Sequence, residues 1–337
     1  MAMCDQLPDH VLDFMKTSSL GEYATLSAAG VPIDSTVLIF PSEGLRSFDL
    51  ATGLSYPAKA ERARRNPRVG LLIEGGPGEP VISIAGMAAV RDCDLQANVD
   101  RYLSECAHTL MYDPDWSLAR KAVWYWPRIL IQVTPASVTW WDSPAMLDRP
   151  PRRWDAPPGT VFPASDPAAP GDTSKPASWQ APPWRELAKQ VLDRKRAGHL
   201  SVVDAAGFPR PIRARPADVT DNGFVLDVPS GVPWEMAGKA CLNFGGIETF
   251  IGEVTDALAG RVVMAVERAL PILPMTQDLT QLWEPTDDTR AQLMQRLHEE
   301  LGRRGQPIPA IPVDRPPPSE GYRRRMARMA ALSASAK

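Results

Sequence analysis

Five cations occupy ten consecutive positions in the segment "SYPAKAERARRNPRVGLLIE", residues 55–74: Lys59, Arg62, Arg64, Arg65 and Arg68. Such a cluster can be a basic face that lies in solvent, or it can bind an anion such as a phosphate. Net charge of the whole chain is −3, so no global positive field accounts for it. An anion site must therefore be local, and the residues around the cluster decide between the two interpretations.

The residues from Tyr56 to Asn66 predict a short helix, with Ser55 as its cap and Asn66-Pro67 as its end. The N-terminus of a helix carries free N–H groups and a positive partial charge, which stabilise an anion. Thr52 and Ser55 precede this end and Lys59 lies within its first turn, which makes a possible phosphate site. By composition alone, the solvated face is the simpler interpretation.

The totals describe an ordinary globular chain of 337 residues, with 44% hydrophobic and 23% charged residues. No apolar run has the length of a membrane span, and the N-terminus has no export signal, so we expect a soluble, cytoplasmic protein that binds neither membrane nor nucleic acid. Four widely spaced cysteines and four histidines without a paired spacing predict no metal site.

The 35 prolines are about twice the usual share, and they concentrate in two stretches that favour linkers over regular elements. We therefore divide the chain into residues 10–143, a proline-rich connection 144–181, residues 182–285, and a C-terminal helix with a basic tail, 286–337. Residues 287–303 carry the apolar stripe of that helix, and the tail itself is expected to be disordered.

The two main parts look like copies of one unit. The turn "AAGVP" at 28–32 recurs as "AAGFP" at 205–209, 177 residues later, and predicted strands follow each turn in the same order. Each half is strand-rich, with turns every 8–12 residues, which is typical of small antiparallel barrels. We predict a mainly β (α+β) fold of two tandem split β-barrels with peripheral helices, forming an internal pseudo-dimer. The alternative is two unrelated α+β domains.

Residues 11–141 resemble the pyridoxamine 5′-phosphate oxidase-like split β-barrel superfamily. The resemblance is carried by the strand "STVLIF", a strand ending "DLAT", and then S-x-x-x-K-A-x-x-x-R-x-N-P-R-V before an apolar strand. It implies a flavin mononucleotide (FMN) site in a groove between two barrels, or in some relatives a deazaflavin (F420) or haem site. It also favours the phosphate interpretation of the basic cluster.

Carried over by position, the resemblance implies that Lys59 pairs with the phosphate, helped by Thr52, Ser55 and the neighbouring Arg62. It also implies that the strand 35–38 lies along the flavin through its backbone. The implied cofactor-binding residues are Ser35, Thr36, Val37, Leu38, Thr52, Ser55, Lys59 and Arg62.

The sequence also departs from the oxidase pattern. Ser35-Thr36 stand where the oxidases have an arginine, and Val81-Ile82 stand where they have a glutamine. In the second copy, Arg213 and Arg215 fall on Thr36 and Leu38, but that half lacks the basic helix. One cofactor site per chain is therefore the simplest expectation.

Four tryptophans have two interpretations. The four tryptophans Trp124, Trp126, Trp140 and Trp141 either stack on a flat ligand or pack in the core. Core packing is the simpler interpretation for them, and Arg128 is expected to face solvent.

The leading hypothesis is an FMN-dependent oxidoreductase acting on a small organic molecule, with no residue singled out as catalytic. A haem-handling protein, a deazaflavin-dependent reductase and a ligand-binding module without turnover remain alternatives, and pairing of two chains remains open.

Overall fold

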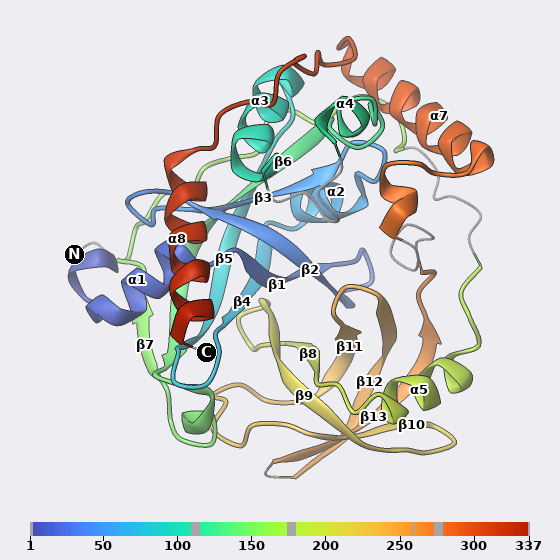
Figure 1. The fold of residues 1–337 in the computed structure, drawn as a ribbon. Helices are drawn as coiled ribbons and strands as arrows, with labels where there is room; N and C mark the ends of the chain where they lie inside the picture. The colour runs from blue at the N-terminus through green and yellow to red at the C-terminus, as the bar shows by residue number, and fades with distance from the viewer. Residues whose placement is uncertain (1–2, 109–114, 174–179, 259, 273–278, 336–337) are drawn as a thin grey trace.

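The computed structural model describes residues 3–108, 115–173, 180–258, 260–272 and 279–335. Its strands form two antiparallel barrels that lie side by side (Figure 1), as the sequence predicts. The first barrel consists of β1 (Leu20–Leu26), β2 (Pro32–Pro41), β3 (Phe48–Gly53), β4 (Arg68–Glu74), β5 (Val81–Arg91) and β6 (Arg128–Trp141). The second consists of β8 (Gly198–Val203), β9 (Pro209–Val219), β10 (Gly223–Asp227), β11 (Gly238–Phe244), β12 (Glu248–Leu258) and β13 (Arg261–Ala269).

The two barrels have the same topology. The first has the strand order β3-β2-β1-β4-β5-β6 and closes through β3 and β6, and the second has the order β10-β9-β8-β11-β12-β13 and closes through β10 and β13. Each strand of the first barrel therefore has a counterpart seven strands later, from β1 and β8 to β6 and β13. The internal repeat predicted from the two turns is confirmed, and two unrelated domains are excluded.

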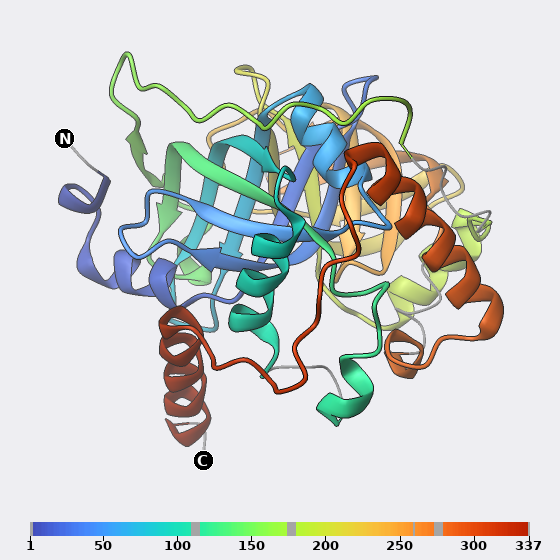
Figure 2. The same cartoon turned by 90° about the horizontal axis from the view of Figure 1, so that it is seen from above.

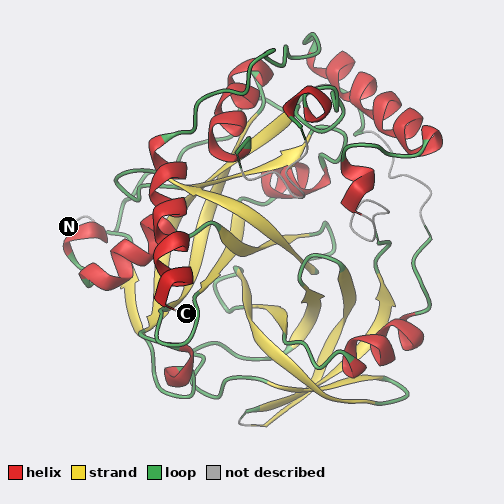
Figure 3. Ribbon diagram, viewed as in Figure 1, coloured by secondary structure: helices red, strands yellow, loops and turns green. Residues whose placement is uncertain are grey.

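The helices lie outside the barrels, mostly around the first one (Figure 3). They are α1 (Asp9–Thr17), α2 (Ala58–Arg65), α3 (Leu95–Cys106), α4 (Trp116–Ala119), α5 (Trp184–Asp193), α7 (Asp287–Arg304) and α8 (Glu320–Ser335), with short 3-10 turns η1 (Met3–Asp5), η2 (Pro144–Met146) and η3 (Leu279–Leu282). Within α7, the predicted stripe of Leu293, Leu297 and Leu301 is buried. No helix in the described part of the chain is long and apolar enough to cross a membrane.

The expectation of a disordered basic tail is wrong, because α8 packs against the first barrel. Arg325 forms an ion pair with Glu105 at 2.7 Å, and its guanidinium lies 5.6 Å from the centre of the Phe40 ring. Arg328 pairs with Glu79. The arginines that made this segment look like a solvated tail are the residues that attach it.

The proline-rich connection packs against the first barrel. It adds the edge strand β7 (Arg152–Asp155) to β6 and then runs as an extended segment across the molecule (Figure 2). Backbone and side chains of residues 164–166 bind the end of β5: Val90 N–H donates to Ser165 Oγ at 3.0 Å, and Asp92 N–H donates to Asp166 Oδ2 at 2.8 Å. An extended chain without a ladder of its own is thus fixed by side-chain hydrogen bonds.

The barrels pack through equivalent elements. Strand β4 contacts β9, and its counterpart β11 contacts β2, the counterpart of β9. Such a reciprocal arrangement is that of a two-fold dimer interface, here within one chain. The approach is close at Gly70 of β4, where a Cβ atom would overlap the carbonyl oxygen of Pro209.

We expect Gly70→Ala to lower the free energy of unfolding by about 1–3 kcal/mol, because the added methyl group forces the two barrels apart. The measurement is urea unfolding followed by circular dichroism. Gly302→Ala is the matched control: a Cβ at this position of α7 meets nothing within 4 Å. Because alanine favours a helix over glycine, the control should be neutral or more stable by up to about 1 kcal/mol. Equal behaviour of the two variants would contradict the close approach.

Candidate functional site

Helix α2 carries most of the basic cluster, and it is shorter than predicted. It runs from Ala58 to Arg65 and follows Pro57, with no side-chain cap at its start. The predicted cap by Ser55 is wrong: Ser55 is buried, and its hydroxyl donates to the carbonyl oxygen of Leu293 in α7 at 3.2 Å. Ser55 therefore attaches α7 to the base of α2 and does not satisfy the helix N-terminus.

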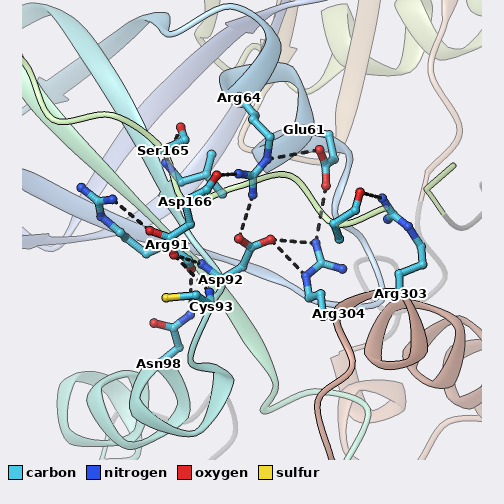
Figure 4. A network of polar contacts seen from close by, with 12 residues as sticks. Glu61, Arg64, Arg91, Asp92, Cys93, Asn98, Ser165, Asp166, Arg303 and Arg304 are labelled. Carbon is cyan, nitrogen blue, oxygen red and sulfur yellow. Dashed lines mark hydrogen bonds and ion pairs between the residues drawn. The ribbon is translucent and has the colours of Figure 1, made fainter. Parts of the chain in front are cut away.

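The cations of α2 divide between two sides of the helix, because Ala60 and Ala63 face the barrel. On one side Arg64 lies in a network of ion pairs (Figure 4). Its guanidinium pairs with Asp92 at 2.8 Å, and Asp92 also pairs with Arg304 of α7 at 3.0 Å. Asp92 and Arg304 are each 3% exposed. This side of α2 is a structural attachment for α7.

On the other side, Lys59 and Arg62 face a cavity of about 400 Å³. The first barrel supplies its floor from the start of β2, the end of β3, α2 and the start of β6. The rest of the chain supplies three residues: Gly246 from the turn between β11 and β12, Leu282 from η3 and Leu293 from α7. The volume is within the usual range for small-molecule sites, about 300–1,000 Å³.

Five of the eight residues predicted to bind the cofactor line this cavity: Ser35, Thr36, Thr52, Lys59 and Arg62. Three do not. Val37 is buried in the core of the first barrel, Leu38 is 38% exposed, and Ser55 binds α7. The contact implied for the strand 35–38 is made through its backbone, so it stays a prediction at Val37 and Leu38.

Arg128 was expected to face solvent, and this is wrong. It is the first residue of β6 and only 9% exposed, and it lines the cavity beside the end of β3, where it pairs in register with Gly53. Its guanidinium lies 4.0 Å from the centre of the Tyr125 ring and 4.4 Å from that of Tyr102. Its Nε is buried without a hydrogen-bond partner in the described residues. The strand pairing, which no local pattern reveals, brings it to Thr52.

The cavity is electropositive. Lys59, Arg62 and Arg128 line it, and no carboxylate is among its described lining residues. Lys59 is half-buried and makes no ion pair or hydrogen bond in the described part of the chain. Arg62 donates from Nε to Thr25 Oγ1 at 2.7 Å, which holds the guanidinium without neutralising it. Three cations in one cavity without a carboxylate in its described lining favour an anionic ligand.

Burial lowers the pKa values of both Lys59 and Arg62. Burial, and then the nearby Arg62, lower the pKa of Lys59 to about 8, against the opposing effect of Asp34 and Glu22. Burial also lowers the pKa of Arg62 to about 10. Burial destabilises the charged forms of Lys59 and Arg62 in the free protein. A bound anion would stabilise these charged forms and raise both pKa values again.

Aromatic side chains form another wall. Tyr56, Trp124 and Tyr125 line the cavity. The hydroxyl of Tyr125 hydrogen-bonds that of Tyr102 at 3.0 Å, and Trp124 is held by its indole N–H on Leu282 O at 3.4 Å. The other three tryptophans of the predicted group, Trp126, Trp140 and Trp141, belong to the core clusters. Core packing is thus confirmed for these three, whereas Trp124 faces the cavity as well as the core.

A chain of polar contacts reaches the cavity from the second barrel. Thr36 donates to Glu22 Oε1 at 2.7 Å, His199 Nδ1 lies 3.4 Å from the same oxygen, and His199 Nε2 lies 2.7 Å from Glu74 Oε2. Burial, followed by the charge of Glu22, raises the pKa of the adjacent Asp34 to about 7, although His199 opposes the shift. The second barrel thereby fixes the hydroxyl of Thr36, which keeps only its acceptor lone pairs for a ligand.

Metal binding has no support in the described residues, where no group of three or more His, Cys, Asp or Glu side chains could hold an ion. No protein-family model matches the sequence, and no curated protein is significantly similar to it.

Several solved structures are similar in fold. General stress protein 26 from Bacillus anthracis is 14% identical, with a TM-score of 0.32 over 44% of this chain and 97% of its own. A pyridoxamine 5′-phosphate oxidase-related, FMN-binding protein from Nostoc punctiforme is 12% identical, with a TM-score of 0.31 over 42% of this chain and 86% of its own. An F420 reductase is 16% identical, with a TM-score of 0.31 over 41% of this chain and all of its own, 100%. These similarities concern the fold alone.

We expect the affinity of the cavity for inorganic phosphate to fall as the pH rises from 7.5 to 9.5. Lys59, whose pKa is lowered to about 8, loses its charge in this window, and the loss removes a charge-assisted contact. Isothermal titration calorimetry at fixed ionic strength measures the effect. In Lys59→Arg the cation persists, so the affinity should stay nearly constant over the same window. An equal fall in both proteins would contradict the role of Lys59.

Proposed function

We propose that this protein is an FMN-dependent oxidoreductase acting on a small organic molecule. The observation that carries the proposal is the cavity at α2, which combines three cations, no carboxylate in its described lining, and an aromatic wall. A phosphorylated ligand with a flat ring system is complementary to both features. Among the similar structures, one is described as FMN-binding and another as an F420 reductase, which supports a flavin-type ligand without identifying it.

The described residues fit a phosphate beside the three cations of the cavity. Lys59 would pair with it as a point charge, Arg62 and Arg128 would add guanidinium donors, and the buried, unpartnered Nε of Arg128 would gain an acceptor. The sequence has Ser35-Thr36 on β2 where the oxidases have an arginine, and Arg128 could supply a cation in its place. A cation from β6 would replace the one that β2 lacks.

The isoalloxazine ring would lie against the aromatic wall of the cavity. Trp124, Tyr125 and Tyr56 would face the ring, and Ser35 and Thr36 would meet it from β2. Thr36 already donates its hydroxyl hydrogen to Glu22, so it would accept a hydrogen bond from the ligand. Val37 and Leu38, implied by the family pattern, are left out of this proposal because they do not line the cavity.

FMN, when bound, supplies hydride or single-electron transfer, which amino-acid side chains cannot provide. The chain's own contribution would be to hold the phosphate, to orient the ring and to exclude water with Leu282 and Leu293. The described lining contains no His, Cys, Asp or Glu. Lysine and tyrosine can also act as general acid or base, but Lys59 is assigned to the phosphate in this proposal, and no catalytic residue is proposed.

The alternatives fit less well. Haem usually takes an axial His, Cys, Met or Tyr, and the described lining offers only Tyr56 and Tyr125, of which Tyr125 is hydrogen-bonded to Tyr102. A deazaflavin would need further cations for its longer acidic tail, and the lining provides three in total. A binding module without turnover would use the same FMN site.

The first experiment is the visible spectrum of the purified protein, followed by titration with FMN. Flavin absorbance in the preparation, or quenching of flavin fluorescence on titration, is the expected result. A Soret band would indicate haem, and tighter binding of F420 than of FMN would indicate a deazaflavin protein. Reduction of the bound flavin by a panel of small organic donors then separates an oxidoreductase from a binding module.

We expect Lys59→Ala to weaken FMN binding roughly ten- to a hundredfold, because a charge-assisted contact contributes about 1.5–3 kcal/mol. Fluorescence quenching gives the dissociation constant. Lys189→Ala, which removes an exposed lysine of α5, should leave it unchanged. An unaltered affinity in Lys59→Ala would refute the phosphate assignment.

The second half of the chain lacks the features that favour a phosphate site in the first half. The interval between β10 and β11 contains no helix. The cavity at the equivalent face, of about 340 Å³, is lined by Asp148 and Asp227 as well as by Arg213 and Arg215. The connection enters this face: Ser230 N–H donates to Asp148 Oδ1 at 2.8 Å, and Gly231 N–H donates to Leu147 O at 3.1 Å. Carboxylates and an inserted segment disfavour a second phosphate.

We therefore expect one FMN per chain. The titration endpoint measured by fluorescence, against a protein concentration from quantitative amino-acid analysis, checks this number. Arg215→Ala, in the lining of the equivalent cavity, should leave both the endpoint and the affinity unchanged. An endpoint of two would show that the second half retains a site.

A further inference from the structure

The second barrel contains a separate cavity of about 380 Å³ at the turn between β8 and β9. Asp204 and Ala206 of the turn, Trp234 of the loop before β11, and Arg153 of β7 contribute to its walls. None of these residues lines the cavity at α2. Whatever this cavity binds is therefore independent of the function proposed above.

Arg210 is the most buried of the charged side chains that line this cavity. It lies on β9, its side chain is 2% exposed, and its Nε donates to Asp204 Oδ2 at 2.8 Å. Its Nη1 is buried and has no hydrogen-bond partner in the described residues. A guanidinium group has five N–H donors in a planar fork, and a buried donor without a partner is costly.

Asp204 does not supply the missing acceptor: its Oδ2 pairs with Arg210 Nε, and its other oxygen holds the turn. Asp204 Oδ1 accepts the backbone N–H of Ala206 at 3.0 Å and of Phe208 at 2.9 Å. These two bonds hold the turn, and they leave one carboxylate oxygen for Arg210. The contact is thus made at Nε, and the two-nitrogen end of the fork is not paired with this carboxylate.

Trp234 adds a second donor at the same place. The guanidinium carbon of Arg210 lies 5.0 Å from the centre of the Trp234 ring, which holds the guanidinium in position. Trp234 is 9% exposed, and its indole Nε1 is buried without a partner in the described residues. Both side chains line the cavity, and each has a buried donor without a partner in the described residues.

We propose that this cavity binds the carboxylate group of a small organic acid, with Arg210 and Trp234 as its donors. A planar carboxylate matches the fork of a guanidinium. The remaining wall is made largely of small apolar residues, among them Val203, Ala205 and Ala237, which suits a short apolar body. Glu235 also lines the cavity and is exposed, so a single negative charge is favoured over a phosphate dianion.

The site belongs to the second copy alone. At the 177-residue spacing of the repeat, the counterparts of Asp204 and Arg210 are Ser27 and Ile33, which can form no such ion pair. The two halves thus carry different charged features. The first has the cationic cavity at α2, and the second has the buried Arg210 at the turn between β8 and β9.

The test is a titration of the full-length protein with sodium benzoate and sodium acetate at constant ionic strength, followed by the indole N–H signals in a proton–nitrogen spectrum. The chain has ten tryptophans, and the signal missing in Trp234→Phe identifies Trp234. We expect this signal to shift to saturation, whereas the signal of Trp124, assigned in the same way, stays in place. Benzamide, which has the same shape without the charge, should not saturate the site.

Arg210→Lys keeps the positive charge but removes the fork, and should weaken carboxylate binding at least about tenfold. If circular dichroism shows that Arg210→Lys does not fold, Trp234→Phe is measured by calorimetry in its place. This variant keeps an aromatic ring and removes one donor, so a weaker affinity for the carboxylate is expected. The proposal is overturned if the Trp234 signal does not saturate, if inorganic phosphate binds as tightly as benzoate, or if the variant that folds binds carboxylate as the natural sequence does.

Discussion

The contact between Glu22 and His199 lies where the two halves of the molecule meet. At the 177-residue spacing these two residues are each other's counterparts, as are Thr36 and Arg213, their partners across β1–β2 and β8–β9. Counterparts that touch lie on the two-fold axis of a dimer. In a dimer of identical chains, glutamate would face glutamate there. Within one chain the two positions can differ, and a carboxylate meets an imidazole at 3.4 Å.

Other features of the interface follow from this complementarity. His199 also contacts Glu74, which Arg213 approaches at 3.2 Å, and Glu22 holds Thr36 at the edge of the cavity. Removing one member of a buried ionic group leaves the others without compensation. The second barrel therefore supports the cavity at α2 mainly by fixing β1 and β2, although it contributes only Gly246 to the lining described.

Divergence of the halves also explains the asymmetry of the cavities. Helix α2 has no counterpart between β10 and β11, and the connection occupies the equivalent face of the second half. Helix α7 covers the first cavity instead, because Arg304 and Ser55 attach it to α2 and its surroundings. In the second half the connection enters the face that corresponds to the first cavity, and in the first half α7 covers that cavity.

The sequence by itself determined the local elements and their order. The paired turns at 28–32 and 205–209, the alternating strands and the basic run were sufficient to predict two barrels and to place Lys59 and Arg62 on a helix, because turn chemistry and periodicity are local properties. Only the tertiary structure decided which side chains meet. Arg128 joins Thr52 through pairing of β3 with β6, Ser55 is taken by α7, and Val37 enters the core. These outcomes depend on contacts between residues far apart in the chain, and neither the spacing of residues nor their composition encodes such contacts.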